Sequence, residues 1–469
     1  MRVKKIRWWA ALLAALTTPV TLPAAPAAAA PITVDTDFNG DGYNDLAVGS
    51  QSYPGHEGTG HSGLITVLYG GPNGLTGRHL IRPEPDCFVV IYNCSGWGRS
   101  LTAGDADGDG KIDLVSAGSA DLQIHSWTAE GVTRKLRWSG RFIRDALTVG
   151  RVDHADPRPD IVGGYAEGYG QVLGGWYNGG SFETAGLSST RRLRPWSMTI
   201  GDIHGDGLSE AMWVGIDVTN GPSGTYVWYS GNLRNPSADP WVLGGPEGCQ
   251  APETSRLACP KNDSVVTLGD VNGDGYRDLV MVTPSTGTLN VWYGDKYGGG
   301  MSRVGYSARG LTWLTTLSTT SQLNLATGDV NGDGAAEISI GVPRATVSGR
   351  TDAGALVLIP GSGTGPVPSA AQVITQDGVA PPDASPTADP IGEQSAEYDN
   401  LGAAVSIIDL TGDGKGELIA GAPGKNGNRG MLVVLPGTAT GVPSTAQVLH
   451  AQDAGATADR ARFAGTLLH

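Results

Sequence analysis

Charged side chains are scarce in this sequence, and basic ones are the scarcer kind. They make up 17% of the 469 residues, with 32 Lys and Arg against 46 Asp and Glu and a net charge of −14. The sequence therefore lacks the basic surface by which proteins bind nucleic acids or anionic membranes. It also lacks any apolar run of the roughly 18 residues that a membrane-spanning helix needs. Hydrophobic residues, at 39%, are still numerous enough for a packed core, which argues against a disordered chain.

The four cysteines are few for a chain of this length, and they form two local couples. Cys87 lies near Cys94 in the sequence, and Cys249 lies near Cys259. Four cysteines allow three pairings, and closeness in sequence favours these two. We predict that each couple closes a short loop as a disulfide, because no His or second Cys stands beside them at the spacing of a zinc site.

The first 30 residues have the layout of a segment that is removed on export. A basic start between Arg2 and Arg7 precedes an apolar run from Trp8 to Leu16, and a small-residue stretch ends at Ala30. This order is that of a secretory signal peptide, and the apolar run is too short for a membrane anchor. We predict a signal peptide over residues 1–30, a secreted extracellular protein, and a single domain over residues 31–469.

Glycine is abundant, with 72 residues, and much of it belongs to an acidic loop that recurs along the chain. The glycines follow no three-residue period, which excludes collagen. Five close copies of the loop begin at residues 37, 105, 270, 329 and 409, with glycine at loop position 6 and oxygen-bearing side chains at positions 1, 3, 5 and 9. The candidate metal ligands, at positions 1, 3, 5, 7 and 9 of each copy, are Asp37, Asn39, Asp41, Tyr43 and Asp45; Asp105, Asp107, Asp109, Lys111 and Asp113; Asp270, Asn272, Asp274, Tyr276 and Asp278; Asp329, Asn331, Asp333, Ala335 and Glu337; and Asp409, Thr411, Asp413, Lys415 and Glu417.

The spacing of these oxygens suits calcium, which takes about six to eight oxygen ligands. Alternate side chains of a tight loop can point inward, position 7 can add its backbone carbonyl, and position 9 can close the shell. A single copy could instead be an Asn/Asp-Gly turn that needs no ion. Five copies in register favour calcium, and we predict about five ions. The loops are not EF-hands, because position 12 carries no Glu and short strands, not helices, flank the loops.

Two degenerate copies complete a series of seven. The copy over residues 202–210 keeps the frame but has His204 at position 3, so we expect weak calcium binding or none. The copy over residues 151–160 has Arg151 at position 1 and one extra residue, and we expect no ion there. Both His204 and His154 are interpreted as decay of the repeat, with transition-metal ligation as the alternative.

Seven units of this spacing predict an all-β fold, a seven-bladed β-propeller of four-stranded antiparallel blades. In each unit one strand leads into the acidic loop, as in residues 100–104 and 324–328, and three more strands follow. The tail from Phe463 to Leu468 looks like one more first strand, with no acidic loop after it. We therefore predict that this C-terminal strand completes the first blade and closes the ring.

The pattern resembles the FG-GAP (or VCBS) repeats of the integrin α-subunit propeller, which also occur in many secreted bacterial proteins. The acidic loops carry the resemblance, together with Gly421-Ala-Pro423 and Gly341-Val-Pro343 after the second strand. The resemblance covers essentially residues 32–469. It implies calcium loops on one face and ligand binding on the opposite face, but it names no ligand.

Three insertions precede first strands, at about residues 82–97, 245–263 and 376–399, and should gather on the face opposite the acidic loops. Trp97 lies in one of them and is a candidate for sugar stacking. The pairs Trp176-Tyr177, Trp228-Tyr229 and Trp292-Tyr293 occupy one repeated position and are interpreted as blade packing.

No catalytic motif for a serine hydrolase, zinc protease, nucleotide or dinucleotide enzyme is present. We predict a secreted calcium-binding module for adhesion to an extracellular glycan or protein, with no nucleic-acid partner. The alternative is an extracellular propeller enzyme, a polysaccharide lyase or hydrolase, with its site in the loops opposite calcium. A cluster of carboxylate, His and Arg side chains on that face would favour the enzyme.

Overall fold

A computed structural model describes the chain over residues 36–54, 63–82, 96–118, 121–128, 131–139, 142–151, 160–165, 171–178, 181–186, 193–217, 225–230, 241–244, 261–295, 306–309, 311, 313–314, 323–382, 384–386, 388–441 and 445–468. The predicted signal peptide and all four cysteines, with their predicted disulfides, lie outside these residues. Within them, no helix is long and apolar enough to cross a membrane.

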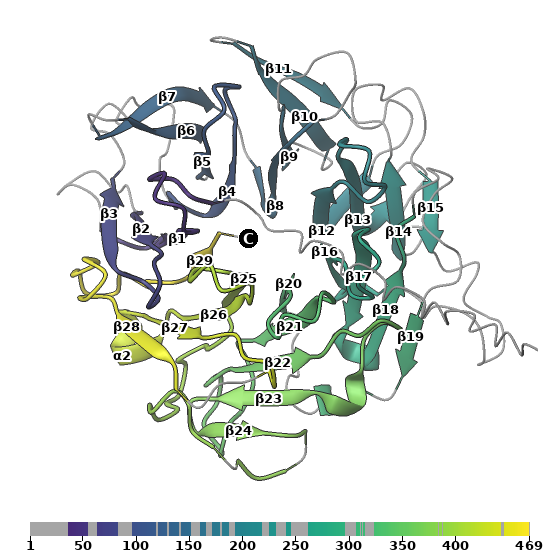
Figure 1. Ribbon diagram of the computed structural model, residues 1–469, viewed down its shortest axis with the longest axis vertical. Helices are drawn as coiled ribbons and strands as arrows, with labels where there is room; N and C mark the ends of the chain where they lie inside the picture. Colours follow the sequence, from purple (N-terminus) through teal and green to yellow (C-terminus); the bar gives the residue numbers. More distant parts are fainter. Residues whose placement is uncertain are drawn as a thin grey trace, which may run out of the picture.

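The described residues form seven antiparallel sheets set around a common centre, as in a β-propeller (Figure 1). Six sheets have four strands and one has five. Strands that follow one another in sequence are neighbours in the sheet, so each sheet runs outward from the centre. The innermost strands are β4 (Ser100–Gly104), β8 (Phe142–Gly150), β12 (Leu193–Gly201), β16 (Val265–Gly269), β20 (Asn324–Gly328), β25 (Ala404–Ile408) and β29 (Thr466–Leu467).

The other strands complete the sheets in order. The second strands are β1 (Leu46–Gly49), β5 (Asp113–Ala117), β9 (Asp160–Tyr165), β13 (Glu210–Asp217), β17 (Asp278–Thr283), β21 (Glu337–Val342) and β26 (Glu417–Ala422). The third strands are β2 (Ile65–Tyr69), β6 (Asp121–Thr128), β10 (Gln171–Asn178), β14 (Thr225–Ser230), β18 (Thr288–Trp292), β22 (Ala355–Ile359) and β27 (Met431–Leu435). The outer strands are β3 (Gly77–Ile81), β7 (Gly131–Ser139), β11 (Ser181–Gly186), β15 (Trp241–Gly244), β19 (Tyr306–Arg309), β23 (Gln372–Thr375) and β28 (Gln447–His450), with β24 (Gly378–Ala380) as a fifth strand beside β23. The helical elements in the described part are single turns, among them α2 (Lys425–Asn428), η3 (Pro284–Thr286) and η4 (Pro368–Ala370).

The two ends of the described chain meet in one sheet. The C-terminal strand β29 pairs antiparallel with β1, with Leu467 opposite Val48, and takes the innermost place in the sheet β29-β1-β2-β3. The strand pairing covers two residues of the tail, fewer than the sequence predicts, and the N–H groups of Gly465 and Leu468 on either side donate to the Gly49 and Ala47 carbonyl oxygens at 3.2 and 2.9 Å. Innermost strands touch their neighbours around the centre in the order β4, β8, β12, β16, β20, β25, β29 and again β4.

Each second strand lies inside its sheet, between the first and third strands, and neighbouring sheets pack against it. Second strands are therefore buried on both faces. Every residue of β17, β21 and β26 is buried, which explains why these strands read as continuous apolar runs. The core lies between the sheets. One cluster joins residues from both ends of the chain, with Leu46 and Ile65 beside Leu432 and Phe463.

A glycine in three of the second strands packs directly on the chain that enters the next sheet. A Cβ atom on Gly49, Gly341 or Gly421 would lie 2.1, 2.2 or 1.9 Å from the carbonyl oxygen of Gly98, Gly402 or Ala464, respectively. The residues before these carbonyls, Trp97, Leu401 and Phe463, are fully buried. The glycine of each Gly-x-Pro sequence therefore belongs to a contact between sheets.

Candidate metal centre in the acidic loops

The acidic loops join first strands to second strands, and each is folded around its position 1 carboxylate. In the loop over residues 270–278, Asp270 Oδ1 accepts the Asp274 N–H at 3.0 Å and Oδ2 accepts the Gly275 N–H at 2.7 Å. Gly275 has a φ of +90°, a conformation that a side chain would disfavour. The other four close copies, and the copy at 202–210, repeat the position 1 bond to the position 6 N–H.

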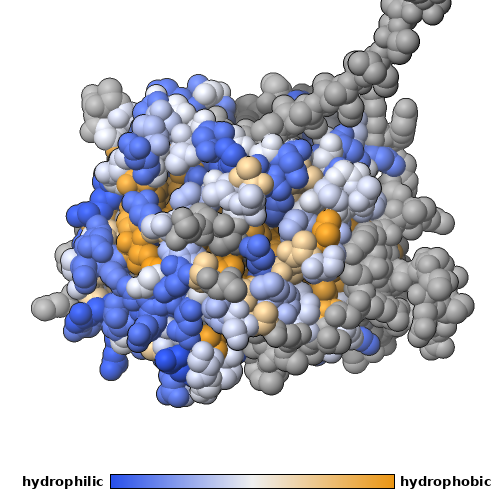
Figure 2. All heavy atoms as spheres, turned by 60° about the horizontal axis from the view of Figure 1, so that its bottom comes forward, coloured by the Kyte–Doolittle hydropathy of each residue, from blue (hydrophilic) through white to orange (hydrophobic). Residues whose placement is uncertain are grey.

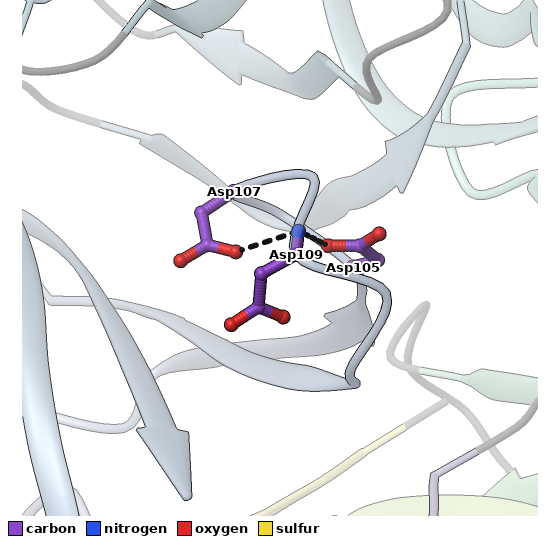
Figure 3. Close-up of side chains that lie close together, drawn as sticks. All are labelled: Asp105, Asp107 and Asp109. Carbon is purple, nitrogen blue, oxygen red and sulfur yellow. Dashed lines mark hydrogen bonds between the residues drawn. The ribbon is translucent and has the colours of Figure 1, made fainter. Parts of the chain in front are cut away.

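Positions 3 and 5 carry their side-chain oxygens to the same side of the loop. In the loop over residues 105–113, ligand oxygens of Asp105, Asp107 and Asp109 all lie within 4.8 Å of one another (Figure 3). Asp105 and Asp107 both accept a hydrogen bond from the Asp109 N–H, at 2.9 and 3.1 Å. Three carboxylates this close repel one another, and a hard cation that takes oxygen ligands would relieve the repulsion.

Position 9 is the anchor of each loop. In the loop over residues 270–278, Asp278 accepts the Val271 N–H at 2.9 Å and the Gly294 N–H at 3.0 Å, which ties the loop to the turn after β18. Equivalent bonds are made by Asp45 to Phe38 and Gly70. Position 9 thus fixes the loop through backbone hydrogen bonds. In the loop over residues 105–113, Asp113 is not one of the three carboxylates whose oxygens lie within 4.8 Å of one another.

Burial gives the position 9 carboxyls an unusual proton affinity. Burial, together with nearby Asp274 and Asp270, raises the pKa of Asp278 to about 8. Burial likewise raises the pKa of Asp45, Glu337 and Glu417 to about 7. The raised pKa values show that the ionised form of these carboxyls is disfavoured when no cation is beside them, and the donor set of carboxylate and amide oxygens fits a calcium ion.

The backbone N–H of position 7 is used within the loop, and the contribution of its carbonyl to an ion stays a prediction. The N–H groups of Tyr43, Tyr276 and Ala335 each donate to the position 5 carboxylate of their own loop at 2.9–3.0 Å. Lys415 differs, because its Nζ also lies 3.1 Å from Asp413 Oδ2. The Lys415 ammonium can therefore compete with a cation for that oxygen.

The structure describes one of the two degenerate copies. The loop over residues 202–210 keeps its frame, with Asp202 and Asp206 accepting the same backbone donors. The His204 ring, however, is buried, and its Nδ1 lies 2.9 Å from the Asp295 carbonyl oxygen. Of the copy at 151–160, residues 152–159, His154 included, lie outside the described part of the chain.

A second cluster of titratable groups lies where the insertion at 376–399 meets the sheet that carries α2. The buried Lys425 Nζ lies 3.3 Å from Asp399 Oδ2 and 3.4 Å from Glu393 Oε2, and it donates to Gln376 Oε1 at 2.6 Å. Glu393 Oε1 lies 3.2 Å from His450 Nε2, at the partly exposed edge of the cluster. Sequence reasoning missed this cluster, because its members come from three separate segments with no shared motif.

The aromatic residues divide differently from the sequence prediction. Trp97, the candidate for sugar stacking, is completely buried and packs edge-on against His125, so the prediction is wrong. Burial of Trp292 and the half-buried Tyr293, which packs against a core cluster, agree with blade packing, whereas the side chains of the pairs at 176–177 and 228–229 lie outside the described part. Tyr398, at 57% exposure, is the exposed large hydrophobic residue in the described part. The face shown in Figure 2 has several separate hydrophobic areas between hydrophilic ones.

Innermost strands surround a central cavity of about 470 Å³. Its wall mixes polar and apolar side chains in about equal measure, with Thr102, Leu268 and Ala326 among the lining residues. Asp270, Arg277 and Asp329 contribute charge to the lining, and Asp270 and Asp329 are position 1 residues of acidic loops. Charge in the cavity is therefore concentrated at the end that the acidic loops surround.

Two family descriptions match the chain in sequence. The FG-GAP-like repeat matches residues 37–116 and 270–339, and the FG-GAP repeat matches residues 323–359 and 401–435. No curated protein matches the chain.

Among solved structures, the BP39L lectin from Burkholderia pseudomallei is 12% identical with a TM-score of 0.46, covering 84% of this chain and 99% of the lectin. The periplasmic gluconolactonase PpgL of Pseudomonas aeruginosa is 12% identical with a TM-score of 0.41, covering 86% of this chain and 95% of the lactonase. Similarities this low carry no argument about what the chain does.

Proposed function

The chain is an FG-GAP repeat β-propeller protein, and from this premise we propose that it is a secreted, calcium-stabilised binding module. The observation that carries the proposal is the loop frame shared by the five close copies, in which the position 1 carboxylate accepts the position 6 N–H and oxygen-bearing side chains stand at positions 3, 5 and 9. In the loop over residues 105–113 the position 1, 3 and 5 side chains are all carboxylates and lie within 4.8 Å of one another, a donor set that suits calcium.

The residues that would hold calcium are those at positions 1, 3, 5, 7 and 9 of the five close copies. When bound, the ion supplies positive charge that neutralises the clustered carboxylates and fixes the loop. Side-chain oxygens at positions 1, 3 and 5 and the carbonyl at position 7 bind, and position 9 orients the loop through its backbone bonds. We expect about five sites with the modest affinity of extracellular calcium modules, roughly 10⁻⁴–10⁻³ M.

We also propose that the seven sheets are the blades of a closed ring over residues 31–469. The contacts between innermost strands support closure, because β29 touches both β25 and β4. The glycine contacts between sheets and the shared core of the two chain ends support it as well. Closure leaves only the short outer edges of the separate sheets and no long open edge.

The proposed ligand face is the one opposite the acidic loops. The insertion at 376–399 is fixed there by Lys425, and it presents the exposed Tyr398 and the partly exposed Glu393. An exposed aromatic ring beside hydrogen-bonding side chains suits a glycan or a protein surface. The lead proposal is therefore adhesion to an extracellular glycan or protein.

A second function, an extracellular polysaccharide lyase or hydrolase, is favoured by one observation. Glu393 and His450 form a carboxylate–imidazole pair that reaches the surface, and such a pair can move protons. Glu393 of this pair also contacts Lys425, which holds the insertion at 376–399 in place. This structural role accounts for the position of Glu393 without catalysis, so binding remains the first proposal.

Calcium calorimetry on the secreted chain, paired with melting in calcium and in chelator, tests the proposal. We expect about five sites and a clear fall in melting temperature in chelator. Absence of both would contradict calcium stabilisation. A glycan array, followed by assays for released reducing ends and for unsaturated products, separates binding from hydrolysis and from lyase activity.

A further inference from the structure

The acidic loops are joined to one another by hydrogen bonds that pass directly between candidate ligand residues. The Ala336 N–H donates to the Asp270 carbonyl oxygen at 2.7 Å, and the Gly416 N–H donates to the Asp329 carbonyl oxygen at 2.7 Å. In both pairs the donor is position 8 of one loop and the acceptor is position 1 of the preceding loop.

The same link crosses the point where the two ends of the chain meet. Position 8 of the first loop is Asn44, whose side-chain Nδ2 donates to the Asp409 carbonyl oxygen at 2.9 Å. Asn44 Oδ1 also accepts the Thr36 N–H at 2.9 Å. Three links therefore join the loops at 270, 329, 409 and 37 into a continuous series, in which the carbonyl oxygens of Asp270, Asp329 and Asp409 each accept a hydrogen bond from the next loop.

A packing contact accompanies each link. The position 7 side chain of one loop lies over the position 4 glycine of the preceding loop, so that a Cβ atom on Gly412 would lie 3.4 Å from the Tyr43 ring. Lys415 lies in the same way over Gly332, and Ala335 over Gly273. Neighbouring loops thus share both a hydrogen bond and a side-chain contact.

This arrangement couples the order of one loop to the order of the next. The position 1 residue accepts hydrogen bonds from its own loop with its side-chain carboxylate and from the next loop with its backbone carbonyl. The donor in the next loop is position 8, which directly precedes the position 9 residue that holds that loop in place. A cation that fixes one loop therefore fixes part of its neighbour in advance, and the neighbour loses less conformational entropy when it binds. The effect is reciprocal between the two sites.

We propose that the loops at 270, 329, 409 and 37 bind calcium with positive cooperativity, transmitted by the bond from position 8 to position 1. The inference rests on the proposed calcium function and adds its regulation. Repulsion between ions acts in the opposite direction, and salt at about 0.3 M screens it.

The test measures one loop at a time by hydrogen–deuterium exchange of the peptide over residues 37–45 during a calcium titration at that salt concentration. The variant Asp413→Ala removes a ligand of the neighbouring loop, and Asn44→Ala removes the link without touching a candidate ligand. We expect Asp413→Ala to raise the calcium midpoint of residues 37–45 roughly two- to tenfold, the worth of one hydrogen bond, when Asn44 is present. In the Asn44→Ala background the same change should leave the midpoint where it is.

Three further variants keep the result clear. Asn44→Asp retains an acceptor for the Thr36 N–H while removing the donor, so it should behave as Asn44→Ala does. Asp413→Asn replaces Asp413→Ala if the latter misfolds. Asp206→Ala, in the degenerate loop across the ring, should not move the midpoint, and a shift there would mean that the readout follows global stability and would overturn the link.

The outcomes separate this inference from the function it rests on. If residues 37–45 show the same calcium midpoint in the wild-type protein and in Asp413→Ala, the two sites are independent. That result overturns the coupling and leaves the proposed calcium binding intact. A wild-type protein whose loops gain no protection in calcium contradicts the calcium function itself, and the coupling with it.

Discussion

A single residue at position 3 distinguishes the acidic loop at 202–210 from the five close copies, for which calcium binding is proposed. The loop at 202–210 keeps the backbone bonds of the others, so its fold does not depend on position 3. What it loses is an oxygen, because His204 is directed to the Asp295 carbonyl. We therefore expect loop shape and cation affinity to be set by different residues, and each can be tested by itself.

Asp274→Ala should remove one calcium site, because position 5 contributes one of the three gathered oxygens. We expect one fewer ion by calorimetry and, in excess calcium, a melting temperature about 1–3 °C lower. Asp206→Ala is the matched control, since it occupies position 5 of the loop that carries His204. An equal loss of calcium in both variants would refute the distinction between the loops.

Glu210→Gln should change how the stability of the calcium-free protein depends on pH. Burial raises the pKa of Glu210 from 4.5 to about 8, so the folded protein holds this proton more tightly than the unfolded chain. The stabilising contribution is complete below about pH 4.5 and is lost as the pH rises through about 8.

The glutamine of Glu210→Gln cannot ionise, and its amide oxygen can still accept the hydrogen bond from the Ile203 N–H. Melting curves in chelator should therefore coincide at pH 4.5 and separate at pH 9, with the variant several degrees higher. Coincidence at both pH values would show that Glu210 is not perturbed.

Among the elements, the strands next to acidic loops were the most predictable from sequence. The predicted first strands at 100–104 and 324–328 coincide with β4 and β20. The apolar runs at 279–282 and 338–340 lie within β17 and β21. These strands follow a motif of fixed length, so the loop sets their register.

Contacts between sheets were much harder to predict, for a physical reason. Gly341 and Gly421 were recognised as part of a motif, but their partners Gly402 and Ala464 follow many residues later. The links between acidic loops and the cluster around Lys425 likewise join segments that have no common sequence pattern. Candidate ligands could be named because they are local, whereas the coupling between them depends on the packing of neighbouring blades.

Gly421→Ala should destabilise the contact between the last sheet and the tail, because the new methyl would lie 1.9 Å from the Ala464 carbonyl oxygen. We expect a loss of about 1–3 kcal/mol in the free energy of unfolding by urea denaturation. Gly363→Ala is the control, since no atom lies within 4 Å of its Cβ position. Equal stability of the two variants would mean that the contact adjusts freely.

Lys425→Met should release the insertion at 376–399. It leaves the buried Asp399 and the adjacent Glu393 without a cation, which typically costs roughly 3–5 kcal/mol. Arg429→Met removes a similar charge from an exposed pair with Asp459, worth at most about 1 kcal/mol. Urea denaturation, with hydrogen exchange over residues 388–399, should separate the two variants, and similar small losses would assign Lys425 no anchoring role.

At the scale of the whole molecule, the fold depends on the meeting of its two ends. Deleting residues 460–469 removes β29 and the buried Phe463, Leu467 and Leu468. We expect the truncated protein to unfold at lower temperature and to gain hydrogen exchange in β1, because that strand loses its inner neighbour. Unchanged exchange in β1 would show that the tail does not complete the first sheet.

The short pairing of β29 with β1 also has a kinetic meaning. Two residues of the tail pair with β1, and the Gly465 and Leu468 N–H groups add backbone bonds to the Gly49 and Ala47 carbonyl oxygens, so a short stretch of chain holds the two ends together. Opening there would expose β1 and the core beneath it. If cleavage of the opened state is fast compared with reclosing, we expect the opening rate of this junction to set the lifetime of the protein in the presence of a protease.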